Sequence, residues 1–139
     1  MLTVLIALLM MFQTPETPVC GQDYYDGLAD LDTQFTELQN AATEAESSSD
    51  FARAYTDLED LIAELPEAPE CLPDAAWVDE GLQIAYEYRL ATVENLHDNN
   101  GTDYIVNSLR FSRIIGELRG YLYAQGVEIT PRVPLSSEE

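Results

Sequence analysis

The chain has 139 residues, which is enough for one domain with a hydrophobic core of its own. It holds 26 acidic residues against six basic ones, all of them Arg, and its formal net charge is −20 at pH 7. A phosphate backbone is bound by Lys and Arg side chains that neutralise it, so this composition excludes nucleic-acid binding.

The N-terminal segment, residues 1–19, is predicted to be a signal peptide followed by a short spacer. Residues 2–12 are apolar except for Thr3, and this length suits the core of a signal peptide better than a membrane span. No basic residue precedes the run and no Ala-x-Ala site follows it, so an uncleaved anchor and a buried N-terminal helix are the alternatives. We expect cleavage within residues 13–19, a secreted or extracytoplasmic location, and no stable membrane insertion of the mature chain.

The first predicted hairpin occupies residues 20–66 of a helical domain that spans residues 20–126. Its first helix runs from Asp23 to Ala45, where apolar residues recur at alternating steps of four and three, the spacing of one helix face. Residues 47–50 end this helix and can cap the next one, which is predicted over residues 51–65 with the same spacing. The prolines of residues 66–73 then predict a stiff, extended connector.

The second predicted hairpin occupies residues 71–126. Within residues 71–97 the polar side chains fall on one narrow face and nearly all other positions are apolar, which indicates a central helix covered by more than one neighbour. A polar loop is predicted over residues 98–102, and a fourth helix over residues 103–125. Gly126 can end this helix, and residues 127–139 are predicted to be an extended C-terminal tail.

The two hairpins resemble each other in sequence. Residues 50–65 align with residues 103–118 at a constant offset of 53, and Cys20 and Cys71 each stand three residues before the Asp that opens a helix. Chance similarity between amphipathic helices is the other explanation. We predict an all-α fold of four helices in two tandem αα-hairpins, stacked as in helical-repeat proteins, with an up-down four-helix bundle as the alternative.

Cys20 and Cys71 are the only cysteines, and in an exported chain we expect them to form a disulfide bond. The bond requires Cα atoms within about 7 Å, so the first and third helices should begin side by side. Lipidation of Cys20 is the alternative, but residues 17–19 fit the lipoprotein motif poorly.

No catalytic, cofactor-binding or metal-ligating residue can be assigned, so the sequence does not predict an enzyme. His97 is the only histidine, and at a helix C-terminus it suits the helix dipole better than the role of a base or ligand. Ser–His and Cys–His pairs and the usual zinc sites therefore lack members. Because carboxylates are plentiful, divalent-metal binding or hydrolysis based on them is the alternative function.

The candidate binding groove lies beside the third helix. Alignment of the hairpins places Arg89 on the apolar seam, where it would be a buried or groove-lining charge that needs an acidic partner. Tyr86 and Tyr88 flank it, and Arg110 and Arg113 of the fourth helix are further candidate contacts, although these arginines can also pair with nearby acids. The sequence thus predicts a small exported binding module with an acidic surface, whose partner is a protein or a cationic ligand.

Overall fold

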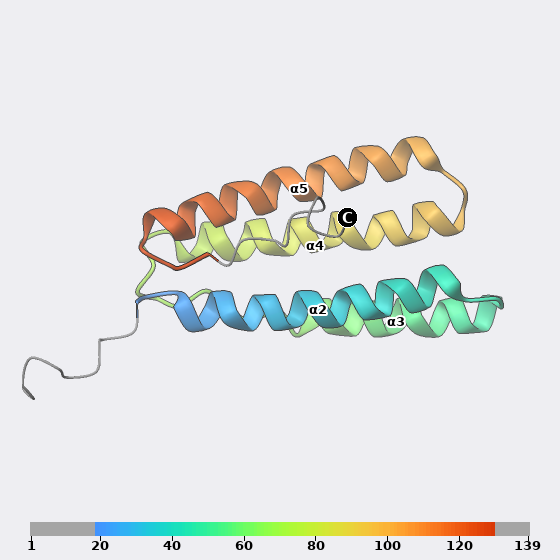
Figure 1. Cartoon of the computed structure of the whole chain (residues 1–139), viewed down its shortest axis with the longest axis horizontal. Coiled ribbons are helices and arrows are strands. Elements are labelled where there is room, and N and C mark those ends of the chain that lie inside the picture. Colours follow the sequence, from blue (N-terminus) through green and yellow to red (C-terminus); the bar gives the residue numbers. More distant parts are fainter. Residues whose placement is uncertain (1–18, 130–139) are drawn as a thin grey trace, which may run out of the picture.

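The computed structural model describes residues 19–129, so the predicted signal peptide and most of the predicted tail lie outside the described residues. The described chain contains the helices α2 (Gln22–Glu44), α3 (Ser48–Ala63), α4 (Ala75–His97) and α5 (Gly101–Ala124). The hairpins α2–α3 and α4–α5 lie one above the other as two layers (Figure 1). The predicted all-α class is confirmed, and the tandem hairpins agree with the helix contacts.

Local signals set the helix boundaries. The Ser47 hydroxyl accepts a hydrogen bond from the N–H of Asp50 at 3.1 Å, and the Asn100 side chain accepts one from the N–H of Asp103 at 3.2 Å. Because Asn100 is the cap, α5 begins at Gly101, two residues before its predicted start. The sequence pattern located the helix but not the residue that caps it.

The helix bounds repeat along the chain. Helices α2 and α4 both have 23 residues, and the second begins and ends 53 residues after the first. The caps of α3 and α5, Ser47 and Asn100, are separated by the same 53 residues. The two hairpins therefore share one plan, except that α5 has 24 residues where α3 has 16.

Helix α4 lies at the centre of the molecule, as its broad apolar surface predicts. It packs against α2, α3 and α5, whereas no Cα atom of α5 comes within 8 Å of α2 or α3. The least exposed side chains come from all four helices and include Phe35, Leu58, Val78, Val93 and Leu122. A square bundle would also pack α5 against a helix of the first hairpin, so the stacked arrangement is the one observed.

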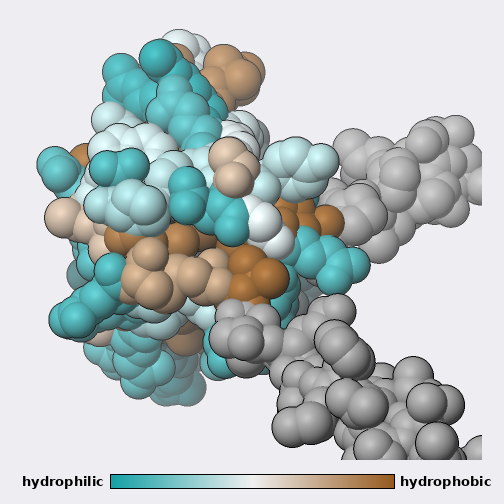
Figure 2. All heavy atoms as spheres, turned by 90° about the vertical axis from the view of Figure 1, so that its left-hand side faces the viewer, coloured by the Kyte–Doolittle hydropathy of each residue, from teal (hydrophilic) through white to brown (hydrophobic). Residues whose placement is uncertain are grey.

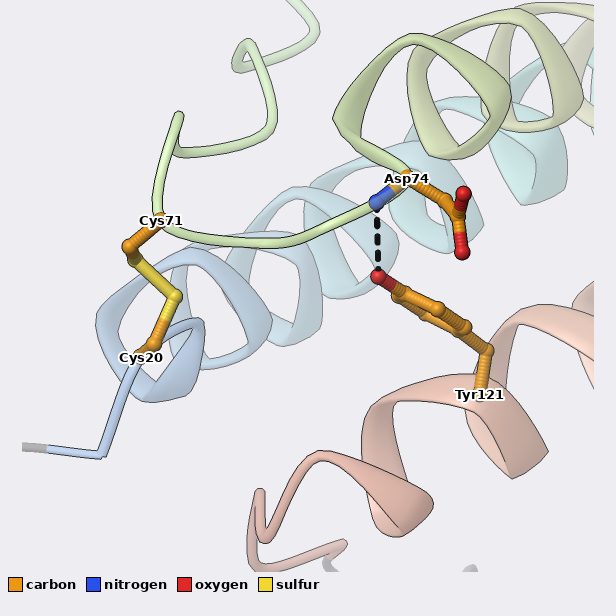
Figure 3. The surroundings of a disulfide bond; sticks show 4 residues. All are labelled: Cys20, Cys71, Asp74 and Tyr121. Atoms are coloured by element: carbon orange, nitrogen blue, oxygen red, sulfur yellow. Dashed lines mark hydrogen bonds between the residues drawn. A yellow bond between two sulfur atoms is a disulfide. The ribbon is translucent and has the colours of Figure 1, made fainter.

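A disulfide bond joins the beginnings of α2 and α4 (Figure 3). Cys20 and Cys71 are bonded with their Cα atoms 6.1 Å apart, which confirms both the predicted pair and the predicted proximity of the two helix ends. Beside them, the backbone N–H of Asp74 donates a hydrogen bond to the Tyr121 hydroxyl at 3.0 Å. This contact attaches the end of α5 to the loop that carries Cys71.

The hairpins also meet at the opposite end of the molecule. The imidazole of His97, in the last turn of α4, stacks on the Phe51 ring with centroids 3.7 Å apart and an interplanar angle of 14°. His97 thus lies at the helix terminus, as the sequence predicts, and additionally links α4 to the beginning of α3.

The segments outside the helices also contribute to the core. In the proline-rich connector, Ala68 is buried and its N–H donates to the Asp79 carboxylate at 2.6 Å. After α5, Val127 is buried, and the backbone of Glu128 exchanges hydrogen bonds of 2.8 and 3.2 Å with the Gln22 side chain. The first residues of the predicted tail therefore pack against the beginning of α2.

Tyr24 presents a buried hydroxyl for which no hydrogen-bond partner is found. Burial raises the pKa of this hydroxyl well above its usual value, and the nearby charge of Asp79 raises the pKa further. An unsatisfied buried polar group costs about 1–3 kcal/mol, so we expect Tyr24→Phe to raise the free energy of unfolding in urea by about 1 kcal/mol. Tyr123→Phe, at an exposed tyrosine, should leave it unchanged. A less stable Tyr24→Phe variant would contradict the assignment.

Candidate binding groove

A groove lies between α2 and α5, with α4 as its floor. It exists because α5 packs on α4 without reaching α2, so apolar side chains of the two outer helices face each other across an open space. Its volume is about 240 Å³. We call it the interhairpin groove, and the following residues line it: Tyr25, Leu28, Ala29 and Asp32 from α2, Leu82 and Tyr86 from α4, and Phe111, Ile115, Leu118, Arg119 and Leu122 from α5.

The apolar walls follow from the helix patterns. On α5 the residues Phe111, Ile115, Leu118 and Leu122 recur at steps of four, three and four, which places them on one face. Phe111, Leu118 and Leu122 are buried, whereas Ile115 is only half-buried, so this face is wider than its contact with α4. Viewed from the end where α2 and α4 begin, the molecule shows apolar surface gathered between two hydrophilic layers (Figure 2).

A charged cluster stands on α4 beside the groove. Arg89 forms an ion pair with Asp32 of α2, and the Tyr86 hydroxyl donates to the same carboxylate at 3.1 Å. The Arg89 guanidinium also donates to the Gln39 side chain at 3.3 Å and to the Thr36 hydroxyl at 2.8 Å. All these acceptors belong to α2, so the cluster ties the second hairpin to the first.

Aromatic rings enclose the guanidinium. The Arg89 Cζ atom lies 4.4 Å from the centroid of the Phe35 ring and 5.3 Å from that of Phe111, distances at which cation–π attraction operates. Burial raises the pKa of the Tyr86 hydroxyl above its usual value, and the Asp32 carboxylate adds to this effect. Because the Arg89 side chain is only 14% exposed and fully engaged, it serves to join the hairpins and is not open to an incoming anion.

The structure brings together two of the five residues predicted for the groove. Tyr86 lines the interhairpin groove, and Arg89 lies beside it. Tyr88 and Arg110 instead form a separate pair between α4 and α5, with the Cζ atom 5.4 Å from the ring centroid. Arg113 is exposed on α5 and pairs with Glu117 one turn later. These three residues do not line the groove.

Sequence reasoning missed the α2 wall of the groove, including Tyr25, Ala29 and Asp32. One signal for Asp32 was present, because Arg89 was predicted to lie on the first helix's seam and to need an acidic partner, and Asp32 stands one turn before Phe35 on that seam. Tyr25 and Ala29 lie off the seam. Their place in the groove depends on the tilt between the two hairpins, which no local pattern specifies.

The surroundings of the groove narrow its chemistry. Across residues 19–129, no three His, Cys, Asp or Glu side chains are grouped so that they could hold a metal ion. None of the four described helices combines the length and apolar character needed to cross a membrane. Comparisons with protein-family models, curated proteins and solved structures gave no significant match. Fold and site together define the class: an all-α protein of two disulfide-linked helical hairpins that form an open apolar groove.

Proposed function

We propose that this protein is an exported binding module that holds an apolar segment of a partner protein in the interhairpin groove. The observation that supports the proposal is the groove itself, whose walls from three helices are mainly apolar. Its volume of about 240 Å³ lies below the ~300–1,000 Å³ of typical small-molecule sites, which favours a few peptide side chains over a larger organic ligand. The disulfide supports export, because such bonds persist in oxidising compartments.

The charges around the groove favour a segment that combines apolar and basic residues. Helix α2, one wall of the groove, carries six acidic residues and no basic one. A Lys or Arg next to the inserted apolar side chains would meet this wall with complementary charge, which speeds association and helps to orient the segment. The partner class is therefore a protein with an exposed apolar segment flanked by cations.

The groove can be tested by filling it. Ala29 is exposed on the α2 wall, so Ala29→Trp should place an indole in the groove without disturbing the core. We expect the neutral dye Nile red to bind the parent chain saturably and to bind Ala29→Trp at least about tenfold more weakly, as fluorescence titration would measure. Ala52→Trp, at an exposed alanine of α3, is the matched control and should bind like the parent.

The partner class can be tested with the same variants. Peptides selected from a random display library on the parent chain should contain Leu, Ile or aromatic residues beside Lys or Arg. They should bind Ala52→Trp, fail to bind Ala29→Trp, and lose affinity at high salt because the charges are screened. Equal binding of dye and peptides to both variants would contradict the proposal.

The alternative function, carboxylate-based metal binding or hydrolysis, is not proposed. The acids of α2 and α3 are distributed along the helices, and Asp32, the acid that lines the groove, is occupied by Arg89 and Tyr86.

A further inference from the structure

The outward face of α5 bears no charged side chain along its most exposed line. The residues that point directly away from α4 form one row, which we call the outer row: Ile105, Leu109, Gly116, Gly120 and Tyr123. The three large side chains of this row are 59%, 65% and 72% exposed, respectively. Because 23% of the chain's residues are charged, a helix face that serves only for solvation would be expected to include some of them.

The two glycines of the outer row are not required by the fold of a single chain. A Cβ atom added at Gly116 or Gly120 would meet no other atom within 4 Å. Inside a helix each glycine costs about 0.5–1 kcal/mol relative to alanine. What a missing Cβ permits on an outer helix face is the close approach of another backbone.

The outer row is nearly symmetric about Gly116. Leu109 stands seven residues before this glycine and Tyr123 seven residues after it. Along one side of the row lie Arg113 and Glu117, which pair at 3.4 Å and are 82% and 53% exposed. A surface with this arrangement is complementary to a second copy of itself turned by 180°.

We propose that two copies of this chain form a dimer through antiparallel packing of α5 on α5, with the two-fold axis at Gly116. Leu109 of each copy then meets Tyr123 of the other, and the glycines let the helices approach closely at the centre. Arg113 of one copy lies beside Glu117 of the other, so the exposed pair becomes a ring of four alternating charges. This surface is separate from the interhairpin groove, and the proposal does not depend on the groove's function.

The charge distribution explains why a second copy would use α5. Helix α2 has six acids and no basic residue, and α3 has four acids and one Arg, whereas α5 has two acids and three Arg. Figure 1 shows α5 on the side of the molecule away from the α2–α3 layer. Pairing through the outer row therefore keeps the acidic layers of the two copies far apart, where their repulsion is smallest.

The dimer is expected to be weak and to be strengthened by salt. A single helix pair buries an area at or below the lower limit of stable interfaces, about 1,200 Å² in total, so we expect a dissociation constant on the order of 100 μM. Salt screens the repulsion between two chains of net charge −20, so a higher salt concentration should favour the dimer.

Sedimentation velocity of the disulfide-bonded chain, from about 10 μM to 1 mM, tests the proposal across the expected dissociation constant. Gly116→Glu should remove the dimer, because it places two like charges at the axis. This change replaces a helix-interior glycine in open space, so a parallel urea titration should show a monomer at least as stable as the parent. The control is Gly27→Glu, which adds the same charge at an exposed α2 glycine with equal space and should retain the dimer.

Exchange of the flanking charges provides a second measurement. Arg113→Glu alone and Glu117→Arg alone should each weaken the dimer several-fold, because like charges then face each other across the axis. The combined Arg113→Glu/Glu117→Arg variant should restore it, because the alternating ring is rebuilt. A chain that stays monomeric at the highest concentration, or a dimer that survives Gly116→Glu, would overturn the proposal.

Discussion

Replacing both Cys20 and Cys71 by serine is expected to lower the free energy of unfolding by about 4 kcal/mol, because the disulfide closes a long loop and restricts the unfolded chain. The two cysteines are 51 residues apart and join the beginnings of the two hairpins. Since a domain of this kind has a total stability of about 5–15 kcal/mol, the loss is a large share of it. The measurement is urea unfolding at equilibrium, followed by circular dichroism.

The parent chain under a strong reductant is the internal control for this experiment. Its stability should fall to that of the double serine variant, because both lack the same covalent link. A loss below about 1 kcal/mol would mean that the interface between the hairpins confines the unfolded chain as well as the disulfide does.

Asp32→Ala is expected to lower the free energy of unfolding by about 2 kcal/mol, because it leaves the Arg89 guanidinium among aromatic rings without its counter-charge. The full cost of a broken buried pair is higher, but the Asp32 side chain is 43% exposed, so water compensates part of the loss. Arg89→Met should cost less, since it leaves behind the more exposed partner. The free energies come from urea unfolding of the disulfide-bonded chain.

Two further variants separate this effect from a general effect of removing a carboxylate. The double variant Asp32→Ala/Arg89→Met should be more stable than Asp32→Ala alone, because no unpaired charge remains between the hairpins. Glu117→Ala breaks an exposed pair on α5 and should change stability by no more than about 0.5 kcal/mol. If Asp32→Ala were as mild as Glu117→Ala, the contacts of Arg89 to Thr36 and Gln39 would suffice to hold it.

Arg89 and the interhairpin groove are related through Tyr86. This tyrosine lines the groove with its ring and donates its hydroxyl to the carboxylate that pairs with Arg89. Loss of the ion pair should therefore loosen the α4 floor of the groove as well as the hairpin interface. The Nile red titration with Asp32→Ala would detect this as weaker binding in a chain that remains folded.

Much of the fold could be predicted from residues close together in the chain. Helix periodicity located all four helices, with small errors at ends that depend on individual caps such as Asn100. The matching helices and the two cysteines predicted tandem hairpins that meet at their beginnings, and the disulfide confirms this proximity. Such features are encoded locally, or by a repeat that can be aligned without knowledge of the fold.

The candidate site was less predictable. The alignment placed Arg89 on a seam and indicated that it needs an acid, but Tyr88, Arg110 and Arg113 were grouped with it only because they share its neighbourhood in sequence. In the structure Arg110 pairs with Tyr88 and Arg113 with Glu117, both outside the groove. The direction of each side chain depends on how α5 is rotated against α4, which periodicity describes only approximately.

The sequence by itself determined the helices, their pairing into hairpins and the residues of the disulfide, because each depends on short-range spacing or on two unique side chains. The tertiary structure alone decided that α5 packs on α4 without reaching α2. That one feature opens the interhairpin groove on one side of α5 and leaves the outer row uncovered by the other helices on the opposite side. It depends on the relative packing of side chains distant in sequence, where small differences in volume and tilt choose between a closed bundle and two stacked layers.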